Sequence, residues 1–104
     1  MKGFDSMMKQ AQAMQAKMAR VQEELAAMEI DGTSGGGMVR VVANGKQEIL
    51  SIRIKPEVVD PEEVEMLEDL IMAALAEARE KAARAMEQAM AKVTGGLGLP
   101  PGLL

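Results

Sequence analysis

Residues 35–56 read GGGMVRVVANGKQEILSIRIKP, and they have the pattern of paired β-strands. Two runs rich in β-branched side chains flank Asn44-Gly45, a dipeptide typical of a two-residue type I′ turn. Apolar residues alternate with others in both runs: Val39, Val41, Ala43, Leu50, Ile52 and Ile54. We expect this apolar row to pack against a core, because successive side chains of a strand point to opposite faces. The opposite face then carries the basic residues Arg40, Arg53 and Lys55.

A hairpin of this kind is only marginally stable in water by itself. A third strand, a covering helix or a partner chain must complete it, and residues 30–33 offer a short additional strand. The three glycines at 35–37 have the composition of a phosphate-binding loop, but no Lys-Ser or Lys-Thr pair follows them. We therefore interpret them as a flexible lead into the first strand of the hairpin.

Residues 4–29 have the period of a long amphipathic helix. Their apolar side chains form a seam with alternating steps of three and four residues: Phe4, Met7, Ala11, Met14, Met18, Val21, Leu25 and Met28. No Gly or Pro interrupts the pattern before Gly32. The helix would be about 39 Å long. We interpret the seam as core, because methionine and leucine at this spacing usually pack against other apolar side chains.

Residues 61–93 predict a second long helix. Asp60-Pro61 is a start signal, with Asp60 as the N-cap, and Gly95-Gly96 is a stop signal. The apolar stripe consists of Val64, Leu67, Ile71, Leu75, Ala78, Ala82, Ala85, Met86, Ala89 and Val93. Several acidic residues lie near the start, where the helix dipole favours them, so we do not interpret them as a metal or acid–base site. This helix would be about 50 Å long.

We expect one domain at residues 1–94 and a flexible tail rich in Gly, Leu and Pro at residues 95–104. A compact domain of this size has a radius of gyration near about 13 Å, too small to contain two such helices. The helices must project as arms or pack with a partner chain, and a homodimer would complete the sheet and bury the seam. The predicted fold is therefore α+β: helix 4–29, strands within about 30–55, and helix 61–93.

The composition restricts the chemistry. The 104 residues include no Cys, His, Trp or Tyr, which excludes disulfides and thiol chemistry and confines acid–base catalysis to carboxylates and lysines. No Ser lies in a nucleophile-elbow sequence. We predict a protein that is not an enzyme and that uses no metal, other cofactor or small-molecule substrate. Apolar runs are too short to span a membrane and no signal segment opens the chain, so we expect a cytoplasmic protein without a membrane partner.

The net charge of −4 conceals a sorting of charge along the chain. Residues 1–22 carry four basic side chains and one acidic one, whereas residues 57–69 carry seven acidic side chains and no basic one. Basic residues follow one flank of each predicted helix: Lys9, Lys17 and Arg20 in the first, and Lys81, Arg84 and Lys92 in the second. An ordinary solvated surface explains any single patch, but such flanks also suit phosphate groups.

Six blocks of the sequence, in this order, resemble the YbaB/EbfC nucleoid-associated proteins of bacteria. They are MKQAQ (8–12), GGMVRV (36–41), NGKQEILSI (44–52), VVDPE (58–62), MLEDL (66–70) and TGGLGLP (94–100). The resemblance covers essentially the whole chain. It implies a cytoplasmic homodimer of α+β fold, with a central sheet and protruding helices shaped like tweezers. It also implies binding to double-stranded DNA with broad or modest sequence preference.

The function predicted from these observations is that of a nucleoid-associated protein. It would bind double-stranded DNA as a homodimer, mainly through phosphates, and would serve nucleoid organisation and, secondarily, gene regulation. The resemblance places binding on the helical arms, and we extend it to Lys9, Lys17, Arg20, Lys81, Arg84 and Lys92. The alternative is a protein-interaction module that uses the Met-rich helix and the Leu-rich tail. Salt distinguishes the two, because phosphate contacts weaken with salt and apolar docking does not.

Overall fold

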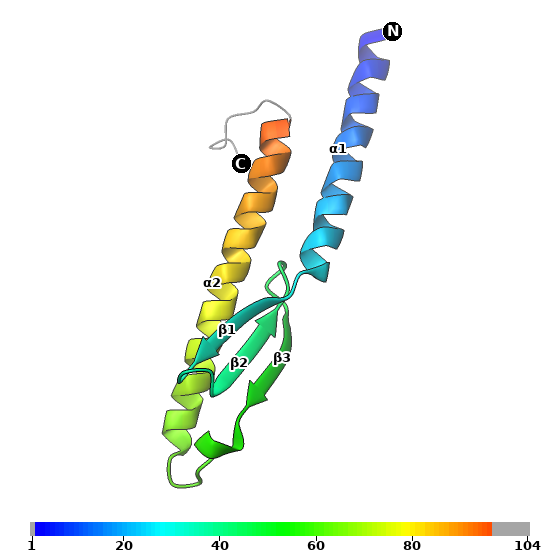
Figure 1. The fold of residues 1–104 in the computed structure, drawn as a ribbon. Coiled ribbons are helices and arrows are strands. Elements are labelled where there is room, and N and C mark those ends of the chain that lie inside the picture. Colours follow the sequence, from blue (N-terminus) through cyan, green and yellow to red (C-terminus); the bar gives the residue numbers. More distant parts are fainter. Residues whose placement is uncertain (1, 97–104) are drawn as a thin grey trace.

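The structure is a computed structural model that describes residues 2–96, and it contains two long helices and one three-stranded sheet (Figure 1). The elements in chain order are α1 (Lys2–Ala27), β1 (Ile30–Ser34), β2 (Val39–Ala43), β3 (Ile49–Ile54), the 3₁₀ helix η1 (Pro56–Val58) and α2 (Val64–Gly96). The predicted α+β class is confirmed, and the additional strand expected at residues 30–33 is present as β1. Most of the predicted tail, residues 97–104, lies outside the described residues.

The sheet is antiparallel throughout, with the strand order β1-β2-β3. Directly opposed residues share a face of the sheet, so the register shows which side chains lie together. Gly32 and Ile52 both oppose Val41, and Ile54 opposes Val39. Arg40 opposes Arg53 on the other face, as the alternation predicts.

Helix α2 packs on the apolar face of the sheet, over β1 and β2 (Figure 1). The core consists of five fully buried side chains: Val39, Val41 and Ala43 from β2, and Ala74 and Ala78 from α2. Alanine on the helix and glycine on β1 allow the two backbones to approach closely. A Cβ atom at Gly32 would collide with the Ala74 carbonyl oxygen and would lie 2.8 Å from the Ala78 Cβ. The contact between α2 and the sheet therefore requires Gly32.

Strand β3 is only partly covered, because α2 lies over the other two strands. Leu50, Ile52 and Ile54 are 52%, 45% and 36% exposed. The prediction that this row packs against a core is therefore wrong within the single chain. The strand is present and the alternation is correct at Ile52 and Ile54, but the register shift places Ile49, not Leu50, opposite Ala43, and Ile49 packs against the core. The apolar face continues across β3, but α2 is too narrow to reach it.

The loop between β2 and β3 is longer than predicted. It spans residues 44–48, and its positive φ (65°) falls on Gln47, so the prediction of a two-residue type I′ turn at Asn44-Gly45 is wrong. The physical reason is the Asn44 side chain, whose Oδ1 accepts hydrogen bonds from the backbone N–H groups of Lys46 (2.9 Å) and Glu48 (3.1 Å). These bonds stabilise a wider turn. The strand register shifts beside it, because Val42 opposes Ser51 whereas Ala43 opposes Ile49.

Gly45 is required for a different reason than its backbone conformation. Its N–H donates a hydrogen bond to the Leu25 carbonyl oxygen (2.8 Å), and a Cβ atom there would lie 2.7 Å from the Leu25 Cδ2. Leu25 belongs to the apolar seam of α1 and is fully buried. The loop therefore holds the end of α1 against the sheet.

The helix boundaries differ from the predicted ones by two or three residues. Helix α1 covers Lys2–Ala27 instead of 4–29, and α2 covers Val64–Gly96 instead of 61–93. Asp60 does not cap α2, because its Oδ1 accepts the N–H of Glu62 (3.0 Å) and its carbonyl oxygen accepts the N–H of Glu63 (2.9 Å). These two bonds form a separate turn, and α2 begins after it.

Beyond the sheet, both helices extend in the same direction as two arms (Figure 1). The molecule measures 73 × 22 × 16 Å, and its radius of gyration is 19.7 Å, well above the roughly 13 Å of a compact domain of this size. The outer part of α1 is uncovered, with Phe4 and Met7 61% and 68% exposed. No helix among the described residues is long and apolar enough to cross a membrane.

The close approach at Gly32 leads to the first prediction. Gly32→Ala should lower the free energy of unfolding by about 3 kcal/mol or more, because a methyl group there meets the backbone of α2 and neither side can yield. Urea denaturation followed by circular dichroism measures this change. Gly3→Ala is the matched control, since Gly3 has open space around it in α1 and alanine favours helix. Equal stabilities of the two variants would contradict the proposed packing of α2.

Candidate nucleic-acid interface

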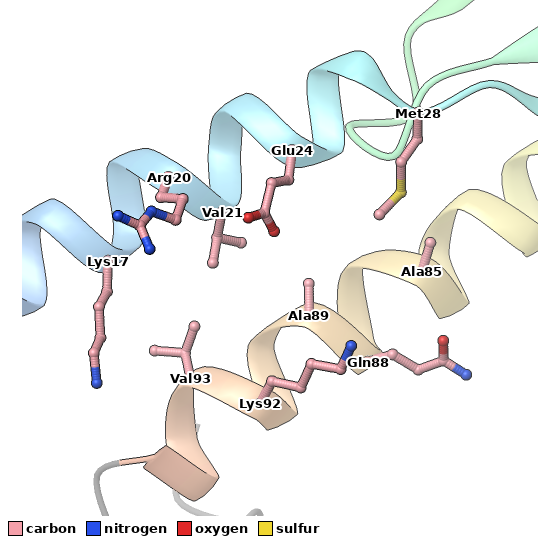
Figure 2. Close-up of a pocket in the computed structure, with 10 residues that line it drawn as sticks. All are labelled: Lys17, Arg20, Val21, Glu24, Met28, Ala85, Gln88, Ala89, Lys92 and Val93. Carbon is pink, nitrogen blue, oxygen red and sulfur yellow. The ribbon is translucent and has the colours of Figure 1, made fainter.

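A groove lies between the arms of α1 and α2, on the side away from the sheet (Figure 2). It has a volume of about 290 Å³, close to the lower limit for pockets that hold small molecules. Ten residues line it: Lys17, Arg20, Val21 and Glu24 from α1, Met28 just after α1, and Ala85, Gln88, Ala89, Lys92 and Val93 from α2. We refer to it below as the arm groove.

The walls of the arm groove are apolar. Val21 of α1 and Met28, just after the end of α1, extend toward α2, and Ala85, Ala89 and Val93 face them (Figure 2). These residues belong to the predicted seam of the first helix and the predicted stripe of the second. Both patterns are thus confirmed as facing surfaces here. The three small or short side chains on α2 leave space that longer side chains would fill, which is why a groove remains between the helices.

Basic side chains surround this apolar groove. Lys17 and Arg20 lie three residues apart on α1, and Lys92 lies opposite them on α2 (Figure 2). Glu24 is the one acidic residue among the ten, so the lining carries a net positive charge. Opposite flanks of two different helices therefore combine into one electropositive site, which attracts anions.

The other three predicted site residues lie elsewhere. Lys81 donates a hydrogen bond to the Asp31 carbonyl oxygen (3.1 Å) and forms an ion pair with Glu77 (2.9 Å). Arg84 is paired with Glu80, four residues before it on α2. Lys9 is exposed on the outer part of α1. The structure thus brings Lys17, Arg20 and Lys92 together and does not bring Lys81, Arg84 or Lys9 to them.

The ion pair between Lys81 and Glu77 lies within α2, and each partner also contacts the backbone of β1, Lys81 at Asp31 and Glu77 at Thr33. The Lys81 ammonium donates a hydrogen bond to the carboxylate and attracts it electrostatically, which lowers the pKa of Glu77, and the Thr33 N–H lowers it further. Burial raises the pKa, by more than the Thr33 N–H lowers it but by less than Lys81 does. Lys81 therefore makes structural contacts within α2 and with β1.

Glu24 is the groove residue that the sequence analysis missed. It continues the basic flank of α1 at a helical step, four residues after Arg20, and an extension of that flank would have found it. Its carboxylate lies near the groove (Figure 2). Within residues 2–96, no group of three or more His, Cys, Asp or Glu side chains is arranged to hold a metal ion.

Comparisons with known proteins match this chain along its length. The model of the YbaB/EbfC DNA-binding family matches residues 1–97. A nucleoid-associated protein of Pelotomaculum thermopropionicum is 55% identical over 97 residues, which are 93% of this chain and 92% of that protein. A nucleoid-associated protein of Paramagnetospirillum magneticum is 55% identical over 102 residues, which are 98% of this chain and 95% of that protein.

A solved structure shares the fold. The crystal structure of an uncharacterized protein from Helicobacter pylori superimposes with a TM-score of 0.63 and covers 75% of this chain and 90% of that chain. Its sequence is 23% identical. The arrangement of two long helices around a small sheet is therefore found at low sequence identity.

The second prediction concerns Glu77, whose carboxylate pairs with Lys81 on α2 and accepts a hydrogen bond from the Thr33 N–H of β1. Since the pKa of Glu77 is lowered in the folded state, its carboxylate stabilises the fold above its ordinary pKa of 4.5. That stabilisation is lost as the pH falls through the lower folded value. Glu77→Gln should therefore be less stable than the wild type at pH 7, and the difference should shrink on acidification. Urea denaturation at pH 7 and pH 3 measures it, and a difference that stays constant would contradict the assignment.

Proposed function

The chain belongs to the YbaB/EbfC DNA-binding family, and from this membership we propose that it binds double-stranded DNA as a homodimer. The relatives named above are nucleoid-associated proteins, which supports a nucleoid location in the cytoplasm and a role in nucleoid organisation. A role in gene regulation would follow from the same binding. The proposed function is non-enzymatic.

The observation that carries this proposal is that Lys17 and Arg20 of α1 and Lys92 of α2 line the same groove. Each of these side chains donates hydrogen bonds and carries a positive charge, and both properties suit phosphate oxygens. Phosphate contacts release counterions and supply affinity without direct information on the base sequence. The mechanism is therefore neutralisation of the DNA backbone between or along the arms, with little base readout.

The remaining predicted residues extend this surface in our proposal. Lys9 lies on the same helix as Lys17, further from the sheet, where it would contact phosphates beyond the groove. Arg84 and Lys81 are exposed on α2, and their pairs with Glu80 and Glu77 lie in water, where such pairs contribute little. Exchange of these acidic partners for phosphate is therefore energetically accessible.

The homodimer is supported by the uncovered face of β3. Ile52 and Ile54 oppose Val41 and Val39 on one face of β3 and are partly exposed, and Leu50 of the same strand is exposed as well. Burial of such side chains stabilises an interface by roughly 1.5–3 kcal/mol each when they become fully covered. A second copy of this chain offers the same surface, so a twofold interface would cover both at once.

Exposed apolar side chains on α1 also favour testing the alternative function, a protein-interaction module. Phe4, Met7 and Met8 are exposed on the outer part of α1, where an apolar protein partner could dock. Apolar docking tolerates or gains from added salt, whereas phosphate contacts weaken with it. A titration of duplex DNA at several salt concentrations therefore separates a DNA-binding protein from an interaction module.

The third prediction concerns DNA. Lys17→Gln combined with Lys92→Gln should weaken binding to all duplexes to a similar degree, because phosphate contacts do not distinguish sequences. The plot of log affinity against log salt should become shallower by roughly 0.9 for each phosphate that the variant no longer binds. A homodimer presents each residue twice, so every substitution acts at two places on the DNA. Gel-shift titrations at several salt concentrations measure both the affinity and the slope.

The matched control for DNA binding changes two basic residues of the sheet. Arg53→Gln combined with Lys55→Gln removes the same charge from β3 and its C-terminal end, away from the arms. This control should retain binding and most of the salt dependence. If the sheet pair abolishes binding while the groove pair leaves it intact, DNA crosses the sheet and the arm groove is not the site.

The fourth prediction concerns the dimer. Ile52→Asp should dissociate it, because the interface would have to bury an unpaired carboxylate. Arg53→Asp is the control, since Arg53 is adjacent in sequence but lies on the opposite face of β3. Sedimentation velocity gives the masses, and the wild-type melting temperature should rise with protein concentration. A wild-type protein that sediments as a folded monomer at micromolar concentration would contradict the dimer.

A further inference from the structure

We propose that the arm groove of one copy of this chain receives the opposite end of a second copy. This end comprises residues 57–66, which run from η1 through the turn that follows it into the start of α2. We refer to it below as the foot. The contact joins copies head to tail and does not require DNA.

The foot carries apolar side chains that its own copy leaves exposed. Val59, Val64 and Met66 are exposed, although side chains of this kind are stabilised when they leave water. Two hydrogen bonds fix the turn between them, because Asp60 accepts the backbone N–H groups of Glu62 and Glu63. The foot is therefore a preformed surface with apolar side chains that a partner can cover.

The charge of the foot is opposite to that of the groove edge. Within residues 2–96, the carboxylates of the foot form no ion pair, and neither do Lys17, Arg20 and Lys92 at the groove. Both surfaces thus combine apolar side chains with unpaired charges, and the two sets of charges are complementary. The foot has no basic residue and five acidic ones: Glu57, Asp60, Glu62, Glu63 and Glu65.

Other exposed apolar surfaces of the chain match the groove less well. The outer part of α1, which exposes Phe4 and Met7, carries Lys2 and Lys9 against the single acid Asp5. Strand β3 carries Arg53 and no acid. Both would bring positive charge to a positive edge, whereas the foot brings negative charge.

The foot and the groove lie at opposite ends of the same molecule. The turn between η1 and α2 is at the end away from the arms (Figure 1), and the molecule is 73 Å long. A foot cannot reach the groove of its own copy, so a second copy must supply it. Because the two surfaces differ, the contact is heterologous and can repeat from copy to copy.

The contact has a consequence for DNA that rests on the proposed function. A foot in the groove would cover Lys17, Arg20 and Lys92, the side chains that carry the proposed phosphate contacts. Duplex DNA and the foot would therefore compete for one groove, and DNA should disperse the assembled copies.

The test reverses the charge of each surface in turn. The groove variant is Lys17→Glu combined with Lys92→Glu, and the foot variant is Glu62→Lys combined with Glu65→Lys. All four side chains are exposed, so both variants should fold, which circular dichroism checks. Sedimentation velocity without DNA then gives the mass of the full-length wild type, of each variant alone, and of an equimolar mixture of the two variants.

We expect the wild type to reach a larger mass at an ionic strength of about 0.01 M than at about 0.15 M, because charges act over roughly 30 Å at the former and 8 Å at the latter. An apolar dimer interface does not strengthen in low salt, so this change is distinct from the β3 contact. A wild-type mass that is the same at both ionic strengths would overturn the proposal.

Each variant alone should associate at least about tenfold more weakly than the wild type in low salt, because its foot and its groove then carry charge of the same sign. The mixture should associate again, since the acidic groove of one variant accepts the basic foot of the other. A mixture that is no larger than the separate variants would overturn the pairing of foot and groove.

Two further variants separate the contact from a general effect of charge. Arg53→Glu combined with Lys55→Glu changes the net charge as much as the groove variant does, but at β3 and its C-terminal end, so association should be retained. An equal loss in this control would overturn the assignment to the groove. Met66→Gln changes no charge and should weaken association roughly threefold or more through lost apolar burial. Unchanged association would overturn the apolar part of the contact.

Addition of a duplex to the assembled wild type tests the competition separately. The mass of the protein assembly should fall as DNA binds, because both occupants need the same cations. Assemblies that persist on protein saturated with DNA would overturn the competition. Since the mixing experiment contains no DNA, its result stands apart from any failure of the proposed function.

Discussion

The close contact between α2 and the sheet is the constraint on which the rest of the structure depends. Gly32 of β1 lies directly against the backbone of α2 at Ala74 and Ala78, and the valines of β2 complete the core beside it. Such a core contains few large side chains, because the helix and the sheet are too close for them. Apolar area buried per residue is therefore modest, and small domains with modest burial depend on further contacts. Because α2 covers only β1 and β2, it also leaves β3 partly exposed.

The position of α2 on the sheet also explains the two arms. Helix α2 crosses the sheet with its first half and must continue beyond it with its second half, since no Gly or Pro interrupts it between Val64 and Gly95. Near the end of helix α1, Leu25 is buried and the loop at Gly45 holds it in place. Small side chains on α2, at Ala85 and Ala89, then leave the arm groove open between the helices. The way the two helices pack near the sheet thus determines the position of the arm groove, which lies beyond the sheet.

Much of the fold could be predicted from the sequence, because helical and strand periods are local signals. The long helices, the strands and the basic flanks of both helices are visible in the spacing of apolar and charged residues. The loop at 44–48 could not be predicted, since Asn-Gly favours a tight turn and only the Asn44 side chain and its bonds select the wider one. The exposure of Ile52 could not be predicted either, because alternation identifies a face but not the width of the helix that covers it.

The arm groove shows what sequence patterns leave undetermined about a site. The sequence shows basic residues on three stretches of the helices and does not distinguish between them. These are Lys17 and Arg20 on α1, Lys92 on α2, and Lys81 with Arg84, also on α2. Only the angle and the offset between the helices bring the first three together and direct Lys81 to Asp31 of β1 instead. A chain with a net charge of −4 can therefore present a positive surface where it needs one. Seven of its sixteen acidic residues lie within residues 57–69, around the start of α2 and away from the arms, and Glu24 is the one acidic residue that lines the groove.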